Sequence, residues 1–441
     1  MPYRHHPPSG STLMSGRRLR LLGRALLASG IALVTAAGAA SADPDIVPRG
    51  ASRPASGQGT IRTPGSGLAQ AADAGVRMRT HVSRFLPLQQ LNPRSAPAAG
   101  YYFETPASLA CLYGLVAPTS GCIPGQVSSL ASGGTKVIAV VDAYDHPNIA
   151  SDLAAYDAQF HLPAANLQVV YAAGRRPATD SSGGWELEEA LDVEMVHALA
   201  PSAKIILVEA ASSSTSDLLK AVDTASSLVA AAGGGQIVMS WGGDEFSGET
   251  SLDSHFATQN VVYLAASGDS PGVNWPAASA NVVAVGGTTV SRHPTTGVLI
   301  SEAAWSNGGG GPSVYVGRPA FQNAQASLVG STRSTPDVAA VADPNTGVWV
   351  YDSFPMDGTA PGWTVVGGTS AATPVTAAII NSSGTFRTSS ATQLDTIYGA
   401  AGSASFKTIS RGLCGPYGGY SPGTVWSPCV GVGSPASRAG F

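Results

Sequence analysis

The stretch of sequence from Lys136 to Phe160 reads KVIAVVDAYDHPNIASDLAAYDAQF. Its first part, residues 136–142, is a mostly apolar, β-branched run, which is typical of a strand buried on both faces. Residues 148–160 then place apolar side chains with a helical period. A buried strand followed by a helix is the first half of a βαβ unit, so this stretch predicts a parallel sheet covered by helices.

The same alternation continues along the chain. Further apolar runs that predict buried strands lie at 167–172, 204–210, 236–242, 261–269 and 282–290, and further helical stretches lie at 186–200 and 214–231. The fold class is therefore α/β, with a doubly wound, mostly parallel sheet. The chain has 441 residues, 44% of them hydrophobic, which is enough for a large core.

Two segments of different composition precede this region. Residues 1–42 carry five arginines. Four of them (Arg17, Arg18, Arg20 and Arg24) stand before a short apolar run and small residues that precede Asp43, which predicts a signal peptide and a secreted, extracellular or periplasmic protein. An uncleaved anchor is the alternative. Residues 43–104 are rich in Pro, Ala, Ser and Gly, with one amphipathic patch at 76–91, and predict a flexible leader or short propeptide. A single folded domain is expected at 105–441.

The charge balance excludes some partners. Only 12% of the residues are charged, against the usual ~25%, which excludes a charge-rich disordered chain. Without residues 1–42 the chain has 19 basic and 28 acidic side chains, a formal charge of −9. An acidic surface repels nucleic acid, so we expect no nucleic-acid partner and no stable membrane anchor, and we expect a monomer.

The four cysteines form two local groups, Cys111 with Cys122 and Cys414 with Cys429. An exported chain meets an oxidising compartment, which favours two short-loop disulfides. Four cysteines allow three pairings, and pairing neighbours is the one that does not tie the ends of the domain together. A zinc site is the rival interpretation and lacks CxxC spacing.

Polar residues stand where three of the predicted strands end: Asp142, Trp241 and Asp269. Ligands of doubly wound sheets bind beyond the carboxyl ends of the strands, so these residues are candidates for a site. Any one of them alone is more often a turn residue or a helix cap.

The segment 367–374, GGTSAATP, precedes an apolar helical run, so Ser370 is expected near the start of a buried helix. Unpaired amides and the helix dipole there stabilise a serine alkoxide and an adjacent oxyanion. Pro374 is expected in the first turn, which needs no amide donor. The alternative is that Ser370 is an ordinary N-cap.

A nucleophilic serine needs a base, and histidine is the usual one. His5 and His6 precede the predicted signal, His81 lies in the leader, and no other histidine sits in a Gly-rich helix-start context. A carboxylate is the other choice. Glu188 and Asp192 lie four residues apart on one predicted helix face, where partial burial and like-charge repulsion would let them share a proton. Acids are common on this helix, so a solvated acidic face is the alternative.

At this point the sequence resembles the sedolisins, serine-carboxyl peptidases with a subtilisin-like fold. The resemblance covers about 105–435 and rests on separate motifs in family order: TPASL at 105–109, EEALD at 188–192, SWG at 240–242, SGDS at 267–270, AVGGT at 284–288 and GTSA at 368–371.

The resemblance implies roles for individual residues. Ser370 matches the nucleophile, Glu188 the general base and Asp192 the residue that orients Glu188 and shares its proton. Asp269 matches the oxyanion-hole acid, a role that needs its protonated form because only that form donates a hydrogen bond. Low working pH follows. Outside these four, Asp142 and Trp241 match positions that in some relatives extend the network behind the glutamate.

The resemblance fails at the calcium site of the family. Thr408 and Ser427 replace its two aspartates, and Val425 replaces a loop glycine. Calcium binds weakly without carboxylates, so we expect no metal and no cofactor. Cys414 and Cys429 lie in the same segment, where a disulfide is expected to replace the ion.

These expectations combine into a secreted serine-type endopeptidase that acts on peptides and proteins at acidic pH, with the peptidase domain at 105–441. The alternative is a sedolisin-like scaffold that has lost activity and binds a ligand. A histidine-dependent subtilase is disfavoured because the required histidine motif is missing.

Overall fold

The computed structural model describes residues 59–70, 72–87 and 101–441. The predicted signal peptide at 1–42 lies outside the described residues. Within the described part, no helix is both long and apolar enough to cross a membrane.

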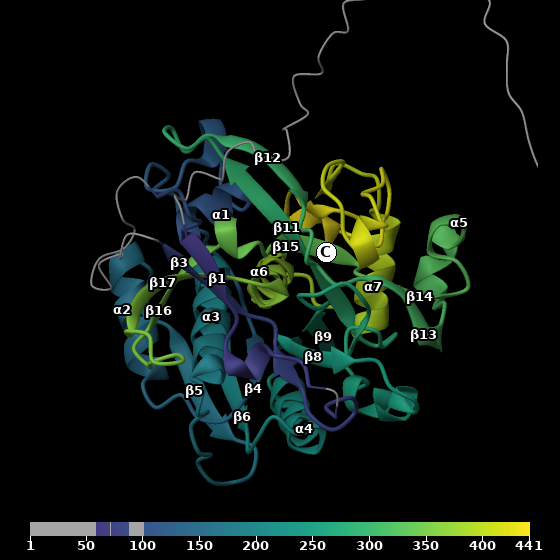
Figure 1. The fold of residues 1–441 in the computed structure, drawn as a ribbon, viewed down its shortest axis with the longest axis horizontal. Coiled ribbons are helices and arrows are strands. Elements are labelled where there is room, and N and C mark those ends of the chain that lie inside the picture. The colour runs from purple at the N-terminus through teal and green to yellow at the C-terminus, as the bar shows by residue number, and fades with distance from the viewer. Residues whose placement is uncertain (1–58, 71, 88–100) are drawn as a thin grey trace, which may run out of the picture. The chain divides into compact units, whose positions relative to one another are not determined.

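The core of the molecule is one large sheet in the strand order β12-β11-β9-β7-β4-β6-β5, with β15 paired to β11 (Figure 1). Its strands are β4 (Val137–Ala143), β5 (Asn166–Tyr171), β6 (Lys204–Ala210), β7 (Gly235–Met239), β9 (Val261–Ala266), β11 (Val283–Arg292), β12 (Leu299–Ala304) and β15 (Val338–Val341). All neighbours run parallel except β12, which is antiparallel to β11. The predicted mostly parallel sheet is confirmed.

Helices cover both faces of this sheet. Alternate residues of β4 point to opposite faces: Ile138 and Val140 join the core beneath α3 (Gly184–Leu199) and α6 (Thr369–Ser382). Val137, Ala139 and Val141 join a second core beneath α4 (Thr215–Ala231). Burial on both faces is why these runs lack a polar alternation. The remaining α-helices of the described residues are α1 (Pro106–Leu112), α2 (Ile149–Phe160), α5 (Ala326–Val329) and α7 (Ser390–Gly399).

Two predicted strands differ in detail from the structure. The run 236–242 is divided into β7 and β8 (Trp241–Asp244), because β8 leaves the large sheet and pairs with β2 and β10 in a separate three-stranded sheet. Strand β5 is not buried on both faces, since it forms one edge of the sheet and exposes Asn166 and Gln168.

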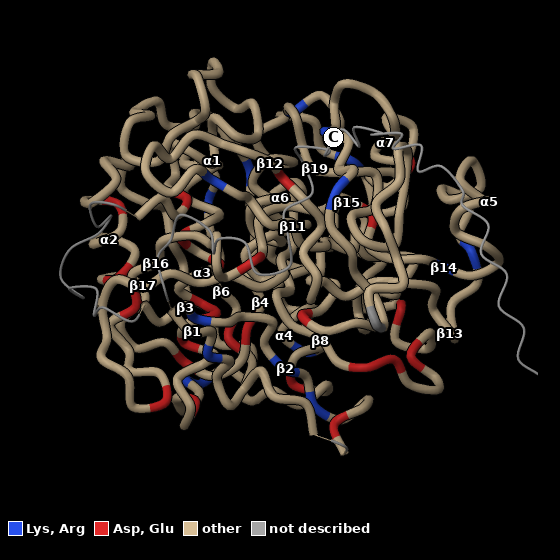
Figure 2. The backbone as a smooth tube through the Cα atoms, turned by 45° about the horizontal axis from the view of Figure 1, so that its top comes forward, with Lys and Arg blue, Asp and Glu red and all other residues tan. Residues whose placement is uncertain are grey.

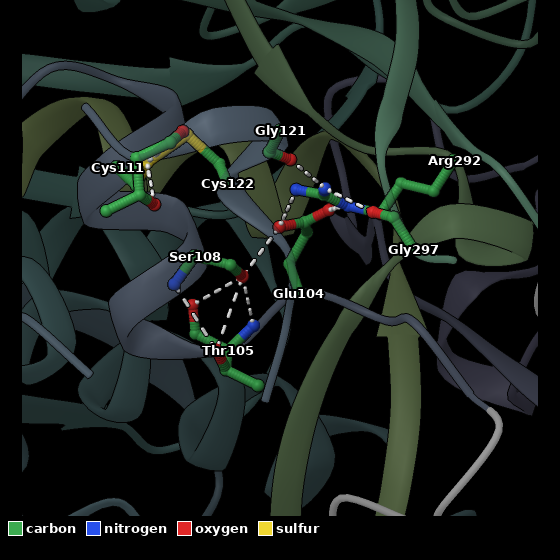
Figure 3. Close-up of a disulfide and its surroundings, with 9 residues drawn as sticks. Glu104, Thr105, Ser108, Cys111, Gly121, Cys122, Arg292 and Gly297 are labelled. Atoms are coloured by element: carbon green, nitrogen blue, oxygen red, sulfur yellow. Dashed lines mark hydrogen bonds and ion pairs between the residues drawn. A yellow bond between two sulfur atoms is a disulfide. The ribbon is translucent and has the colours of Figure 1, made fainter. Parts of the chain in front are cut away.

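A capped helix opens the predicted domain. Thr105 caps α1, and its hydroxyl and that of Ser108 form a reciprocal capping box. The Ser108 hydroxyl also donates to Glu104 at 2.7 Å, and Glu104 pairs with the buried Arg292 of β11 (Figure 3). The Cys111–Cys122 disulfide closes the loop beyond the helix, as predicted.

The predicted flexible leader is wrong for residues 59–87. They form β1 (Gly59–Arg62), β2 (Arg79–Thr80) and β3 (Ser83–Pro87). Strand β3 pairs with β17 (Gly362–Gly367) in a four-stranded antiparallel sheet of order β1-β3-β17-β16, where β16 is Val348–Asp352. Strand β2 pairs with β8. The described part of the leader is therefore an integral layer of the domain.

Shorter strands complete the C-terminal half: β10 (Asn274–Trp275), β13 (Gly311–Gly317), β14 (Thr332–Thr335), β18 (Phe406–Lys407) and β19 (Ser434–Pro435). The second predicted disulfide, Cys414–Cys429, is also present, and both sulfurs lie in a small core with Ala339, Ile409 and Val430. Thr408 directly follows β18, and Ser427 exchanges two backbone hydrogen bonds with Gly431.

Candidate active site

Ser370 lies at the second position of α6 and is fully buried. Its hydroxyl donates to the carbonyl oxygen of Ser240 at 2.9 Å. Gly368, the residue that precedes the helix, has a φ of 119°, which favours glycine. A Cβ at Gly368 would also lie 1.9 Å from the carbonyl oxygen of His81 and 2.6 Å from Oδ2 of Asp269. This crowding explains the glycine and shows that both oxygens approach the start of α6.

Pro374 does not lie in the first turn as expected, because α6 begins at Thr369 and places the proline inside the helix. Proline lacks the N–H that would bond the carbonyl four residues earlier, which belongs to Ser370. The Ser240 hydroxyl approaches that carbonyl oxygen at 3.4 Å. The proline therefore leaves the backbone of the candidate nucleophile open to a contact from outside the helix.

Glu188 and Asp192 project from α3, which packs against α6. Both side chains are fully buried, and Oδ1 of Asp192 accepts a hydrogen bond from Ser240 Oγ at 2.8 Å. The carboxylate oxygens of Glu188 have no hydrogen-bond partner among the described residues. The Ser370 hydroxyl, whose own hydrogen bond goes to Ser240, is near enough to favour the ionised form of Glu188.

Burial is the main cause that raises the pKa of Glu188 well above its ordinary value, and the carboxylates of Asp192 and Asp142 raise it further. Burial, followed by Asp142, also raises the pKa of Asp192, while the Ser240 hydroxyl opposes this rise. Burial and mutual repulsion of charge favour a state in which two neighbouring carboxyl groups share one proton. The pair can therefore accept one proton from a neighbouring hydroxyl while it keeps another.

Asp269 follows β9 and faces the start of α6. Its Oδ1 accepts hydrogen bonds from the backbone N–H and the hydroxyl of Thr369, at 2.7 and 2.9 Å. Its Oδ2 is buried and has no partner in the described part of the chain. Burial raises the pKa of Asp269 to about 7, against the hydrogen bonds of Thr369 and the charge of Arg79, which lower it. Below that pH, Oδ2 of Asp269 can carry a proton and act as a hydrogen-bond donor.

The two other predicted residues, Asp142 and Trp241, also lie at this rim. Asp142 is near the end of β4, and burial raises its pKa to about 8. Its carboxylate raises the pKa of both Glu188 and Asp192, so it lies within electrostatic range of the pair. Trp241 donates from Nε1 to the carbonyl of Val141 at 2.7 Å, so the indole holds the end of β4 in place.

The alternative of a solvated acidic face on α3 does not hold. All of its acids are buried, including Glu186, Glu189 and Glu194. Figure 2 shows acidic positions gathered where α3, β4 and β6 run beside one another. Burial is the first cause of the raised pKa of each of these three. Burial on this helix thus favours the neutral form of each of these carboxylic acids.

His81 is a backbone neighbour of the candidate nucleophile that the sequence analysis did not identify, because it placed His81 in the predicted leader. The backbone N–H of Ser370 donates to the His81 carbonyl oxygen at 3.2 Å, and the His81 N–H donates to Ser240 O at 3.3 Å. The amphipathic patch at 76–91 was the only signal available. Backbone pairing of this kind leaves no side-chain pattern to read.

A cluster of His146, Asp152 and Asp352 has donor atoms close enough to hold a metal ion. However, Nδ1 of His146 accepts a hydrogen bond from the Asn148 N–H at 3.2 Å, so Nε2 carries the proton. That nitrogen lies 3.5 and 3.4 Å from the two carboxylates. In this arrangement the Nε2–H of His146 points toward the two carboxylates, so Nε2 offers no lone pair to a metal ion.

Known proteins share this arrangement of sequence and fold. A model of the Subtilase family matches residues 172–383. Kumamolisin from Bacillus sp. (strain MN-32) is 32% identical over 342 residues, which cover 69% of this chain and 59% of kumamolisin. Sedolisin from Pseudomonas sp. (strain 101) is 34% identical over 118 residues, 24% of this chain and 19% of sedolisin. The chain thus spans less than two thirds of the length of either relative.

Solved structures agree on the fold. Pseudomonas sedolisin, a serine-carboxyl proteinase complexed with two molecules of pseudo-iodotyrostatin, superposes with a TM-score of 0.62 at 22% identity, over 76% of this chain and 96% of that one. A structure described as S41 psychrophilic protease has a TM-score of 0.50 at 18% identity, over 74% and 96% of the two chains. These likenesses confirm a subtilisin-like fold. With the motifs and the curated relatives, they establish that this chain belongs to the sedolisin family.

Proposed function

We propose that this chain is a secreted serine-type endopeptidase that hydrolyses peptide bonds at acidic pH through Ser370, Glu188 and Asp192, with Asp269 in the oxyanion hole. The observation that carries the proposal is the position of one carbonyl oxygen, that of His81. The Ser370 N–H donates to it, and Oδ2 of Asp269 approaches the same point. A backbone N–H and an unpartnered carboxyl oxygen beside a serine hydroxyl are the groups that an oxyanion hole for acyl transfer requires.

The residues divide the chemistry as follows. The hydroxyl of Ser370 turns from Ser240 O to Glu188, gives up its proton and attacks a substrate carbonyl. The developing oxyanion is held by the Ser370 N–H and by protonated Asp269. Glu188 then passes the proton to the leaving amine. Asp192 holds the second proton of the pair and is itself positioned by Ser240. Water hydrolyses the acyl-enzyme and restores Ser370.

The protonation of Asp269 fixes the direction in which activity should change with pH. Asp269 donates only while protonated, and its pKa lies at about 7 in the buried site. Activity should therefore be present at low pH and be lost as pH rises through that region. A histidine base would give the opposite dependence, since imidazole must lose its proton to act.

The test is hydrolysis of acid-denatured casein by the secreted chain from pH 2.5 to 7. We expect activity that declines toward neutrality and disappears in Ser370→Ala. An inactive scaffold that binds peptides would show no hydrolysis at any pH, although it would retain peptide affinity. An optimum near pH 8 would mean that a different base is at work.

A further inference from the structure

A set of buried acids lies next to the catalytic pair, which is Glu188 and Asp192. Asp142 of β4 and Glu209 of β6 are paired in register, so their side chains lie beside each other on one face of the sheet. This is the face that α3 covers. Burial raises the pKa of Glu189 on α3 well above its ordinary value, and the charges of Glu209 and Asp142 raise it further, so Glu189 lies close to both. The three acids are at most 1% exposed.

The surroundings of these acids supply few hydrogen-bond donors. Both carboxyl oxygens of Asp142 and of Glu189 are buried without a hydrogen-bond partner among the described residues. Burial of a carboxylate that accepts no hydrogen bond is costly, so the ionised form is disfavoured. A protonated acid, in contrast, can donate its O–H to a neighbouring carboxyl group. The protons of the acids themselves can therefore link one carboxyl group to the next.

One end of this set of acids reaches the surface. Strand β5 lies beside β6 at the edge of the sheet (Figure 1), and its partly exposed Tyr171 is in register with Glu209. Asp145 lies two residues beyond β4, and burial, followed by the charge of Asp145, raises the pKa of Glu209 to about 9. Asp145 accepts a hydrogen bond from Nε of Arg176 at 2.6 Å. The Arg176 side chain is 54% exposed, so solvent reaches this ion pair.

The catalytic pair, at the other end, is closed to solvent. Glu188 and Asp192 are both fully buried. The cavity of about 310 Å³ beside Asp269 is lined by neither of them. Besides burial and, for Glu188, the charge of Asp192, the charge of Asp142 raises the pKa of each member of the pair. Asp142 is thus the acid that connects the pair to the others.

We propose that Asp142, Glu189, Glu209 and Asp145, here called the acid row, form a route by which the catalytic pair exchanges protons with solvent. Glu189 and Glu209 are positioning residues, because they act through Asp142 and touch no substrate. This inference rests on the proposed function. The route lets the pair recover its shared proton while a substrate fills the groove.

The transfer is balanced at every acid. A hydronium ion gives one proton to the acid row at Asp145. Each acid then passes its own O–H proton to its neighbour and receives one from the other side, until one proton arrives at the catalytic pair. No bond to carbon changes, and one water molecule is left at the surface. The reverse sequence releases a proton.

The test measures proton uptake directly in the full chain and needs no catalysis. In the Ser370→Ala background, the infrared C=O stretch of protonated carboxyl groups is followed after a jump from pH 8 to pH 5, and the signal of the pair is the one that Glu188→Gln removes. Uptake by the pair should be roughly tenfold slower in Glu209→Gln and in Glu189→Gln, because glutamine keeps the side-chain shape but cannot pass on a carboxyl proton.

Glu194→Gln is the matched control. It makes the same change on the same helix, but Glu194 accepts from the Tyr351 N–H at 3.1 Å, and its acidic neighbours are Asp152, Asp352 and Asp157. Its uptake rate should equal that of the parent. Glu209→Asp restores a carboxyl group and should recover part of the rate, whereas a packing defect would persist. Equal rates in Glu209→Gln and Glu194→Gln, or no recovery in Glu209→Asp, would overturn the proposal.

Casein hydrolysis by the chain with Ser370 intact separates this inference from the proposed function. Hydrolysis at pH 4 together with parental uptake in Glu209→Gln would refute the acid row alone. Slow uptake in Glu209→Gln together with no hydrolysis at any pH would retain the route and refute the proposed function.

Discussion

The hydroxyl of Ser240 donates to Asp192 at 2.8 Å, and this bond fixes the acid that supports Glu188. The same serine uses its backbone carbonyl to accept from the Ser370 hydroxyl. One residue thus contacts both the nucleophile and the acidic pair. Because its hydroxyl favours the ionised form of Asp192, Ser240 also influences how the pair shares its proton.

Ser240→Ala should therefore act as a change in a positioning residue. Loss of a hydrogen bond to a charged group costs about 1.5–3 kcal/mol, so kcat should fall roughly ten- to hundredfold. The pKa of Asp192 should rise, which moves the acid limb of the pH profile to higher pH. A matched control is Ser279→Ala, which removes a similar serine-to-aspartate bond, to Asp253, away from the site. An unmoved acid limb in Ser240→Ala would refute the role.

Asp269→Asn should relax the pH dependence. The amide oxygen can still accept from Thr369, while the amide N–H₂ takes the place of Oδ2 and donates at every pH. The alkaline limb of kcat/KM should therefore move upward from that of the parent. Asp269→Ala, which donates nothing, should lose roughly 10²–10³ in kcat. If both variants kept the parent profile, Asp269 would not be the oxyanion donor.

Stability should fall as pH rises. Burial raises the pKa of Asp142 and Glu186 to about 8 and of Glu209 to about 9, so the folded chain keeps protons that the unfolded chain releases near pH 4 to 5. Stability from these groups is present below that range and is lost up to pH 8 to 9. His81 acts oppositely, with its pKa lowered to about 3, but it is one group against several.

The melting temperature of Ser370→Ala, which cannot digest itself, should thus be higher at pH 4.5 than at pH 8. Glu186→Gln should reduce this difference, because glutamine carries no charge at either pH. A melting temperature that rises toward pH 8 would mean that the buried acids are ionised and paired in the fold.

The C-terminal loop should depend on its disulfide and not on calcium. The bridge between Cys414 and Cys429 closes a loop of 15 residues in sequence separation, for which chain entropy gives about 3 kcal/mol. Cys414→Ser with Cys429→Ser should lower the melting temperature by several degrees. EDTA should leave it unchanged, since Thr408 and Ser427 supply no carboxylate. Destabilisation by EDTA would reveal a calcium site and refute this prediction.

The fold was predictable because its alternating apolar and helical runs leave a local pattern, and the motifs around the four catalytic candidates were visible in the sequence for the same reason. The run at 204–210 is mostly apolar because the strand is buried between helices, and its bounds are those of β6. The burial of Glu194 was not predictable, since its partner is the backbone N–H of Tyr351, far along the chain. Strand β2 was missed because it has two residues, which pair with β8 through their backbone. Such contacts depend on tertiary structure and leave little trace in composition.

The central claim is that Glu188 is the general base. Its most direct test compares casein hydrolysis at pH 4 by Glu188→Gln and by His255→Ala, a partly exposed histidine paired with Asp223. Glutamine is isosteric but cannot take a proton. We predict a loss of about 10⁴-fold or more for Glu188→Gln and none for His255→Ala. Activity of Glu188→Gln within tenfold of its parent would contradict the account.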